Sequence, residues 1–126
     1  MEIANIGKLG EDIACKFLVS KGHRILERNF RVKAGEIDIV SKNGESLYVV
    51  EVKTTLGNKI EALEDLGPEE NVHAQKLRRL SRAARLFLTQ RSVPENAALE
   101  FVVVAITLDT QENTAYVNMI SETLPA

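Results

Sequence analysis

Two β-branched runs separated by the dipeptide Asn43-Gly44 constrain the fold of this chain more than any other feature. The runs are "GEIDIVSK" at residues 35–42 and "SLYVVEVKT" at residues 46–54. Asn-Gly between two such runs is the strongest short-range signal of a β-hairpin. The sequence therefore predicts an antiparallel pair of strands here, although acidic residues interrupt runs that otherwise suit burial.

The acidic residues of the predicted hairpin gather on one face. Side chains alternate along a strand, so Glu36, Asp38 and Val40 share one face of the first strand and Ile37 and Ile39 the other. On the second strand, one face carries Leu47, Val49, Glu51 and Lys53, and the opposite face carries Tyr48, Val50 and Val52. Equal spacing from Asn43-Gly44 predicts the pairs Val40 with Leu47, Asp38 with Val49 and Glu36 with Glu51.

A divalent cation would relieve the repulsion between these acids. Paired side chains lie about 5 Å apart at Cβ, so facing carboxylates destabilise an isolated hairpin. Mg²⁺ takes oxygen ligands and commonly binds one or two carboxylates, waters and a substrate phosphate. We therefore expect Asp38 and Glu51 to bind Mg²⁺ or Mn²⁺, with the Val52 carbonyl exposed between them at the end of the strand.

Lys53 adds a positive charge on the same face as Glu51. It is placed to stabilise a phosphorane-like transition state or to position and deprotonate an attacking water. A lone Glu-x-Lys is usually a solvated edge pair, and the functional interpretation rests on Asp38 and on Gly35-Glu36 across the hairpin. Asp38, Glu51, Lys53 and Glu36 are therefore the candidate catalytic residues for metal-dependent hydrolysis of phosphodiester bonds.

Hydrophobic periodicity predicts the remaining elements of a single domain at residues 1–126. We expect an amphipathic helix at 6–21 that ends at Gly22, a strand at 23–30, a second helix at 73–90, a buried strand at 98–108 and a further strand at 114–120. Periodicity fails from Leu56 to Asn71, which predicts a loop. This order is typical of an α/β fold with helices flanking a central mixed sheet.

The distribution of charge qualifies a formal net charge of -2. Phosphate binding normally leaves a basic footprint, and six basic residues lie between Lys76 and Arg91 with no acidic residue among them. On a helical wheel, the arginines lie opposite an apolar stripe. Lys76, Arg78, Arg79 and Arg82 are therefore candidate nucleic-acid-binding residues, although any one arginine also fits a solvated helix surface.

Other classes of protein find little support. No segment reaches the apolar length needed to cross a bilayer, and the first residues lack the basic start and apolar run of a secretory signal, so we expect a cytoplasmic protein with no membrane partner. The one cysteine, Cys15, excludes an internal disulfide and fits a packing role. Too few histidines accompany it for a zinc cluster.

Asp38, twelve intervening residues and Glu51-Val52-Lys53 resemble the metal-binding signature of the PD-(D/E)xK nuclease superfamily. More closely, residues 9–54, which include "GEIDIV" and "VVEVKT", resemble the YraN-like family of predicted bacterial endonucleases, similar to archaeal Holliday-junction resolvases. The resemblance implies a restriction-endonuclease-like three-layer sandwich, with a central mixed sheet between helices, and leaves a homodimer open. It also implies that Glu11 contributes to the metal site and that Lys76 matches a lysine opening the family's second helix.

Two positions depart from the pattern of that family. Thr55 stands where we expect an arginine, and Glu100-Phe101-Val102 stands where we expect Arg-Phe-Asp. Both changes affect contacts with a substrate rather than the metal ligands. Two functions therefore stay open: a metal-dependent nuclease acting on DNA, including branched or structured DNA, and a catalytically inactive nucleic-acid-binding or adaptor module. A purely structural protein is a third, less specific interpretation.

Overall fold

The computed structural model describes residues 5–64, 70–91 and 98–122. In chain order the elements are α1 (Ile6–Ser20), β1 (Arg24–Val32), β2 (Gly35–Asn43), β3 (Ser46–Leu56), α2 (Lys59–Glu64), α3 (Glu70–Gln90), β4 (Ala98–Asp109) and β5 (Thr114–Glu122). The five strands form one sheet in the order β1-β2-β3-β4-β5, in which only the β3–β4 pair is parallel. The predicted α/β class with a mixed sheet is therefore confirmed.

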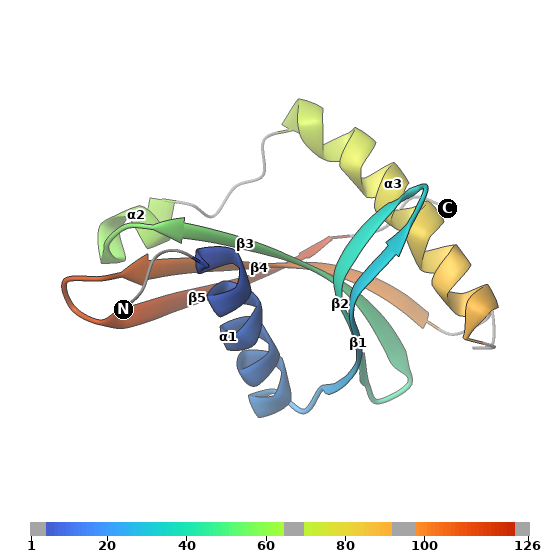
Figure 1. The fold of residues 1–126 in the computed structure, drawn as a ribbon, viewed down its shortest axis with the longest axis horizontal. Coiled ribbons are helices and arrows are strands. Elements are labelled where there is room, and N and C mark those ends of the chain that lie inside the picture. Colours follow the sequence, from blue (N-terminus) through green and yellow to red (C-terminus); the bar gives the residue numbers. More distant parts are fainter. Residues whose placement is uncertain (1–4, 65–69, 92–97, 123–126) are drawn as a thin grey trace.

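Helices α1 and α3 cover opposite faces of this sheet, which gives three layers (Figure 1). On one face, Ala14 and Leu18 of α1 are fully buried against the sheet. On the other face, Phe87 of α3 packs against the strands. Alternation along β3 supplies both layers, because Val49 belongs to the α3 cluster and Val50 to the α1 cluster. The arrangement is consistent with the expected three-layer sandwich.

Glycines fix how α1 ends and how closely it approaches the sheet. Gly22 has φ +94°, and the amides of Gly22 and His23 bond back to the helix at Val19 and Leu18, as in a Schellman motif. Within α1, a Cβ added at Gly10 would lie 1.8 Å from Oγ1 of Thr54 in β3. Only glycine allows α1 to lie this close to β3.

The hairpin register differs from the predicted one. Asn43 pairs with Ser46, and Val40 pairs with Val49 rather than Leu47. The two-residue turn is Gly44-Glu45, not Asn43-Gly44, because Gly44 adopts φ +64° at the first central position, where a type II′ turn places glycine. The predicted pairs Asp38 with Val49 and Glu36 with Glu51 are therefore wrong. The correction moves each partner by two residues, so the faces assigned to β3 do not change.

Strand β2 leaves β3 before the acidic residues are reached. The last pair of the β2–β3 ladder is Ile39 with Val50, whereas β1 and β2 continue to pair as far as Gly35. The β1–β2 arm then curves toward α3 (Figure 1). As a result, Ile37 belongs to the α3 cluster and Ile39 to the α1 cluster. The expectation that these two isoleucines share a face is wrong because the arm twists after the ladder ends.

The segment predicted to be a loop, residues 56–71, contains a short helix. Strand β3 extends to Leu56, and α2 follows it after Gly57-Asn58. Asn58 caps α2, since its Oδ1 accepts a hydrogen bond of 3.0 Å from the amide of Glu61. The α3 helix already begins at Glu70. Residues 65–69 of the predicted loop lie outside the described residues.

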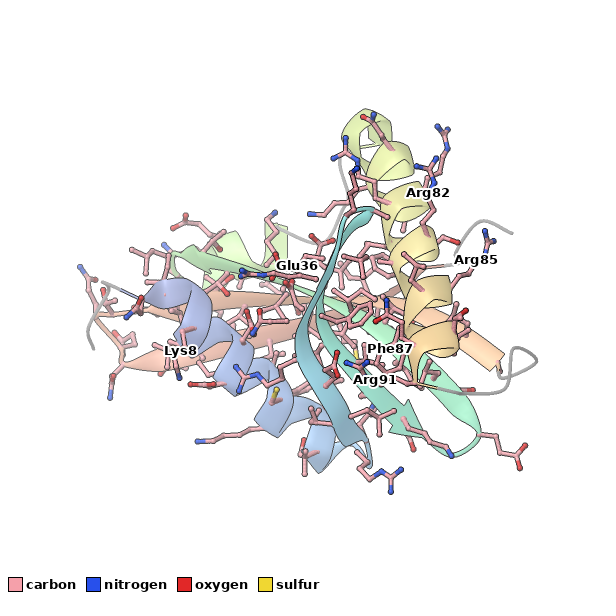
Figure 2. The ribbon with its side chains drawn as sticks, turned by 45° about the vertical axis from the view of Figure 1, so that its right-hand side comes forward. Lys8, Glu36, Arg82, Arg85, Phe87 and Arg91 are labelled. Atoms are coloured by element: carbon pink, nitrogen blue, oxygen red, sulfur yellow. The ribbon has the colours of Figure 1, made fainter. Side chains whose placement is uncertain are left out.

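The outer face of α3 carries the arginines, as its periodicity predicts. Arg78, Arg79, Arg82 and Arg85 are exposed, whereas Leu80, Ala84, Phe87 and Leu88 are buried. Figure 2 shows Arg82 and Arg85 projecting away from the sheet. In the described ranges, none of the helices combines the length and apolar character needed to cross a membrane.

Candidate functional site

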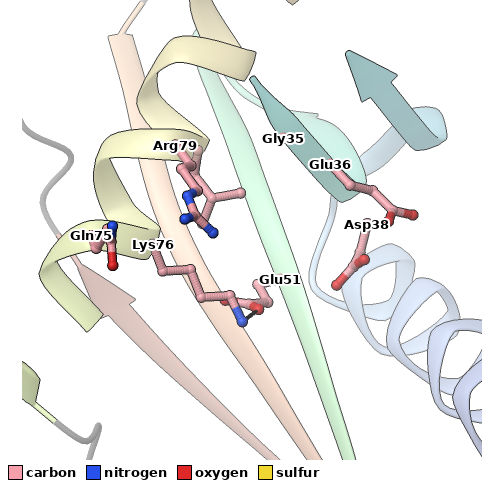
Figure 3. Close-up of a pocket in the computed structure, with 8 residues that line it drawn as sticks. Gly35, Glu36, Asp38, Glu51, Gln75, Lys76 and Arg79 are labelled. Carbon is pink, nitrogen blue, oxygen red and sulfur yellow. Dashed lines mark ion pairs between the residues drawn. The ribbon is translucent and has the colours of Figure 1, made fainter. Parts of the chain in front are cut away.

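A pocket of 420 Å³ lies between the β2 arm, β3 and α3 (Figure 3). Its lining residues are Gly35, Glu36 and Asp38 from β2, Glu51 from β3, and Gln75, Lys76, Arg79 and Leu80 from α3. The pocket exists because β2 parts from β3 after Ile39, which leaves β3 uncovered on that side. Of the four predicted catalytic residues, three line this pocket, namely Glu36, Asp38 and Glu51. Basic residues of α3 line its other side.

Asp38 lies where the two strands separate and is anchored to the backbone of β3. Its Oδ2 accepts a hydrogen bond of 2.8 Å from the amide of Val52. Burial raises the pKa of Asp38, the Val52 amide opposes this rise, the negative charges of Glu11 and Glu36 add to it, and Lys76 lowers the pKa. Its charge is therefore poorly compensated by the protein alone, which favours a cation beside it.

The carbonyl of Val52 faces the same gap as Asp38. The N–H and C=O groups of one strand residue point toward the same neighbouring strand, and the Val52 N–H points at Asp38. The carbonyl is therefore directed to the β2 side, as a metal ligand would require. The expectation that the strand ends near Val52 is wrong. On its β4 edge, β3 continues to pair as far as Leu56 with Leu108.

Glu51 forms an ion pair with Lys76 of α3. Only 17% of the Glu51 side chain is exposed, whereas 51% of the Lys76 side chain is exposed. A carboxylate that is largely removed from water needs a positive partner, and Lys76 supplies it across the pocket (Figure 3). The two predicted metal-binding carboxylates, Asp38 and Glu51, therefore border one pocket from adjacent strands.

Glu11 is near the pocket but is held by other partners. Its Oε1 accepts hydrogen bonds from Asn29 at 3.2 Å and from Arg28 at 3.4 Å. Arg28 also pairs with Asp12 at 2.9 Å, and together with Lys8 it lowers the pKa of that carboxyl. Glu11 therefore acts on Asp38 through its charge and does not line the pocket.

Glu36 and Lys53 occupy the edges of the site. Glu36 lines the pocket, is exposed, and accepts a hydrogen bond of 3.2 Å from Nε of Arg31 on β1. Lys53 is exposed two residues beyond Glu51 and is not among the residues that line the pocket. Alternation nevertheless keeps Lys53 on the same face of β3 as Glu51.

The four predicted nucleic-acid-binding residues divide into two pairs. Lys76 and Arg79 are three positions apart, so they share an edge of α3, and both line the pocket. Arg78 and Arg82 are exposed on the helix outside the pocket lining. Two positive side chains of α3 therefore face the pocket, and two lie on the exposed surface of the helix outside it.

The donor set fits a magnesium-type site with few protein ligands. Within the described part of the chain, no three histidine, cysteine, aspartate or glutamate side chains come close enough together to enclose a metal ion. Mg²⁺ does not require such a cage, because it usually keeps several waters and binds one or two carboxylates together with substrate phosphates. Asp38, Glu51 and the Val52 carbonyl match that smaller set.

Three further residues of this region were missed from the sequence. Gln75 lines the pocket next to Lys76, and Arg28 and Asn29 fix Glu11. The position of Gln75, four residues before Arg79 on a helix, could have indicated a shared edge. Asn29 gave no such signal, because its hydrogen bond to Glu11 joins β1 to α1 across 18 residues of the chain.

Fold and pocket together define an α/β protein with helices on both faces of a mixed sheet and a combined acidic and basic pocket at the point where β2 and β3 separate. The model of the family described as "Uncharacterised protein family UPF0102" matches residues 10–106, and the chain belongs to this family. This confirms the resemblance to YraN-like proteins, whereas membership of the nuclease superfamily stays a prediction.

Relatives named as UPF0102 proteins match most of the chain. One from Thermotoga petrophila is 41% identical over 97 residues, which cover 77% of this chain and 83% of the relative. One from Moorella thermoacetica is 40% identical over 114 residues and 90% of each chain. One from Caldicellulosiruptor bescii is 32% identical over 122 residues, which cover 97% of this chain and 98% of the relative.

Proposed function

We propose that the protein is a metal-dependent nuclease that hydrolyses phosphodiester bonds in DNA, including branched or structured DNA. The observation that carries the proposal is one pocket lined by two carboxylates on adjacent strands, Asp38 and Glu51, and by two cations on α3, Lys76 and Arg79. The two carboxylates suit a divalent metal ion, and the lysine and arginine side chains suit a phosphate group. The pocket therefore suits a metal ion and a phosphate together.

The charges explain why a phosphate would need a metal here. Asp38, Glu51 and Glu36 would repel a phosphodiester approaching the pocket, and Lys76 already neutralises one of them. Bound Mg²⁺ or Mn²⁺ would supply Lewis-acid activation of the phosphoryl oxygen and of a water nucleophile. Asp38, Glu51 and the Val52 carbonyl would hold the ion, Arg79 would orient the phosphate, and Lys53 would serve the water or the developing charge.

The experiment that tests this proposal measures cleavage of branched, flapped, single-stranded and duplex DNA with Mg²⁺ or Mn²⁺. We expect Asp38→Asn and Glu51→Gln to lower the cleavage rate on the order of 100-fold, since each removes a charge that acts in the transition state. Glu45→Gln is the matched control. It removes one negative charge from the exposed hairpin turn and should leave cleavage unchanged.

Retention of cleavage in both site variants would overturn the assignment. Wild-type protein that binds DNA without turnover, with binding insensitive to Asp38→Asn, would instead identify the adaptor module that Thr55 and Glu100 leave open. Binding that does not weaken with salt would argue against phosphate recognition altogether.

A further inference from the structure

We infer that Lys76 is an exchangeable counter-ion: it neutralises Glu51 in the metal-free protein, leaves Glu51 when a divalent cation takes those oxygens, and then contacts the phosphate of the substrate. The inference deepens the proposed function and rests on it. It assigns to α3 a role in the metal site itself, beyond general attraction of nucleic acid.

The ion pair between Lys76 and Glu51 occupies the position where the cation would bind. Glu51 is largely buried and forms an ion pair with the ammonium group of Lys76. Lys76 also lowers the pKa of Asp38. One ammonium group therefore neutralises Glu51 and offsets a small part of the negative charge around Asp38.

Simultaneous binding of Lys76 and a divalent cation to the Glu51 carboxylate is electrostatically unfavourable. Two positive charges within a few ångströms repel strongly in a partly buried site. Lysine is suited to exchange, because its ammonium group sits on a flexible four-carbon stem and needs no fixed hydrogen-bond geometry. With half of its side chain exposed, Lys76 can move without unpacking α3.

The released ammonium group would stay beside the bound phosphate. Lys76 and Arg79 both line the pocket opposite the β2 acids, and Figure 3 shows both side chains extending from α3 toward Glu51. A phosphate bridging the cation would therefore meet two positive groups from one helix. In this arrangement Lys76 occupies the metal-binding oxygens of Glu51 before the metal binds and contacts the substrate phosphate afterwards.

Mn²⁺ affinity, measured by calorimetry at pH 8 without DNA, tests the exchange directly. Lys76→Met should bind Mn²⁺ about fivefold more tightly than wild type, the effect expected from removing a partly exposed competing charge. Lys16→Met is the matched control, because it makes the same change on the exposed side of α1 and should leave the affinity unchanged. Lys76→Gln also removes the positive charge, with a polar side chain, and should likewise bind Mn²⁺ more tightly than wild type, so it tests the exchange if Lys76→Met does not fold.

Cleavage at saturating Mn²⁺ separates this inference from the proposed function. Lys76→Met should then raise the KM for DNA about fivefold or more, because a phosphate contact is lost. Tighter Mn²⁺ binding by Lys76→Met without any DNA cleavage by wild type would support the exchange and overturn the nuclease. Unchanged or weaker Mn²⁺ binding by Lys76→Met, or no binding by any variant, would overturn the exchange even where wild type cleaves DNA.

Discussion

The carboxylate of Asp38 and the backbone amide of Val52 are joined by a 2.8 Å hydrogen bond just beyond the last pair of the β2–β3 ladder. The side chain therefore replaces a strand partner at the point where β2 leaves β3. This bond ties the acidic pocket to the sheet, so the position of the carboxylate is set by the register of the hairpin. It also directs the Val52 carbonyl toward the same gap.

Asp38→Asn should make the protein more stable at neutral pH while removing metal binding. Burial raises the pKa of Asp38 above its ordinary value of 3.8, so ionisation is easier in the unfolded chain. The folded state therefore loses stability as the pH rises from 3.8 through the raised pKa. Asparagine keeps an oxygen for the Val52 amide, and the free energy of unfolding at pH 7 should rise by about 1 kcal/mol at most.

Urea denaturation of Asp38→Asn and wild type at pH 7 and pH 4 measures this difference. The gain should shrink at pH 4, where the carboxyl of wild type is more fully protonated. A variant that is less stable than wild type at pH 7 would show that the ionised carboxylate stabilises the fold instead.

Gly10→Ala should destabilise the protein by about 1–3 kcal/mol, because the added methyl group would overlap Thr54 and push α1 away from β3. Gly7→Ala in the same helix is the control. Its Cβ would meet nothing within 4 Å, and alanine should stabilise the helix by about 0.5–1 kcal/mol. Thermal unfolding of both variants measures the contrast, and equal effects would show that α1 does not lie this close to β3.

His23 should make the fold sensitive to mild acid. Its ring is buried against Tyr48, with centroids 4.5 Å apart, and Nδ1 lies 2.9 Å from Oγ of Ser41. Burial lowers the pKa of His23 below 6.5, so its contribution to stability is complete above pH 6.5 and is lost as the pH falls toward the lowered value.

Denaturation at pH 7.5 and pH 5.5 measures the effect of His23. Wild type should lose up to about 1 kcal/mol more of its unfolding free energy than His23→Gln over this interval. An identical decrease in the two proteins would assign the acid sensitivity to other groups.

Arg79→Ala and Arg82→Ala should affect DNA differently although both remove an exposed arginine of α3. Arg79 lines the pocket, and its loss should lower the rate at saturating DNA about tenfold. Arg82 does not line the pocket and projects away from the sheet (Figure 2), and its loss should weaken DNA binding without changing that rate. Steady-state kinetics at two salt concentrations separates the effects, and equal rate losses would contradict the division of α3 into two edges.

Local signals in the sequence account for most of the elements but not for their register. Asn43-Gly44 predicted the hairpin, yet the turn uses Gly44-Glu45, because the positive φ of Gly44 fits the first central position. Helix α2 was missed although Asn58 is a good capping residue, since a six-residue helix has too few apolar positions to show a period.

The sequence by itself determined which residues alternate on β3, where the apolar stripe of α3 runs and which family the chain resembles. The alternation and the apolar stripe depend only on neighbours along the chain, because the geometry of strands and helices fixes them. Only the tertiary structure decided that Asp38, Glu51 and Lys76 share one pocket while Arg82 does not. That outcome depends on where β2 parts from β3 and on how α3 crosses the sheet, which no local pattern encodes.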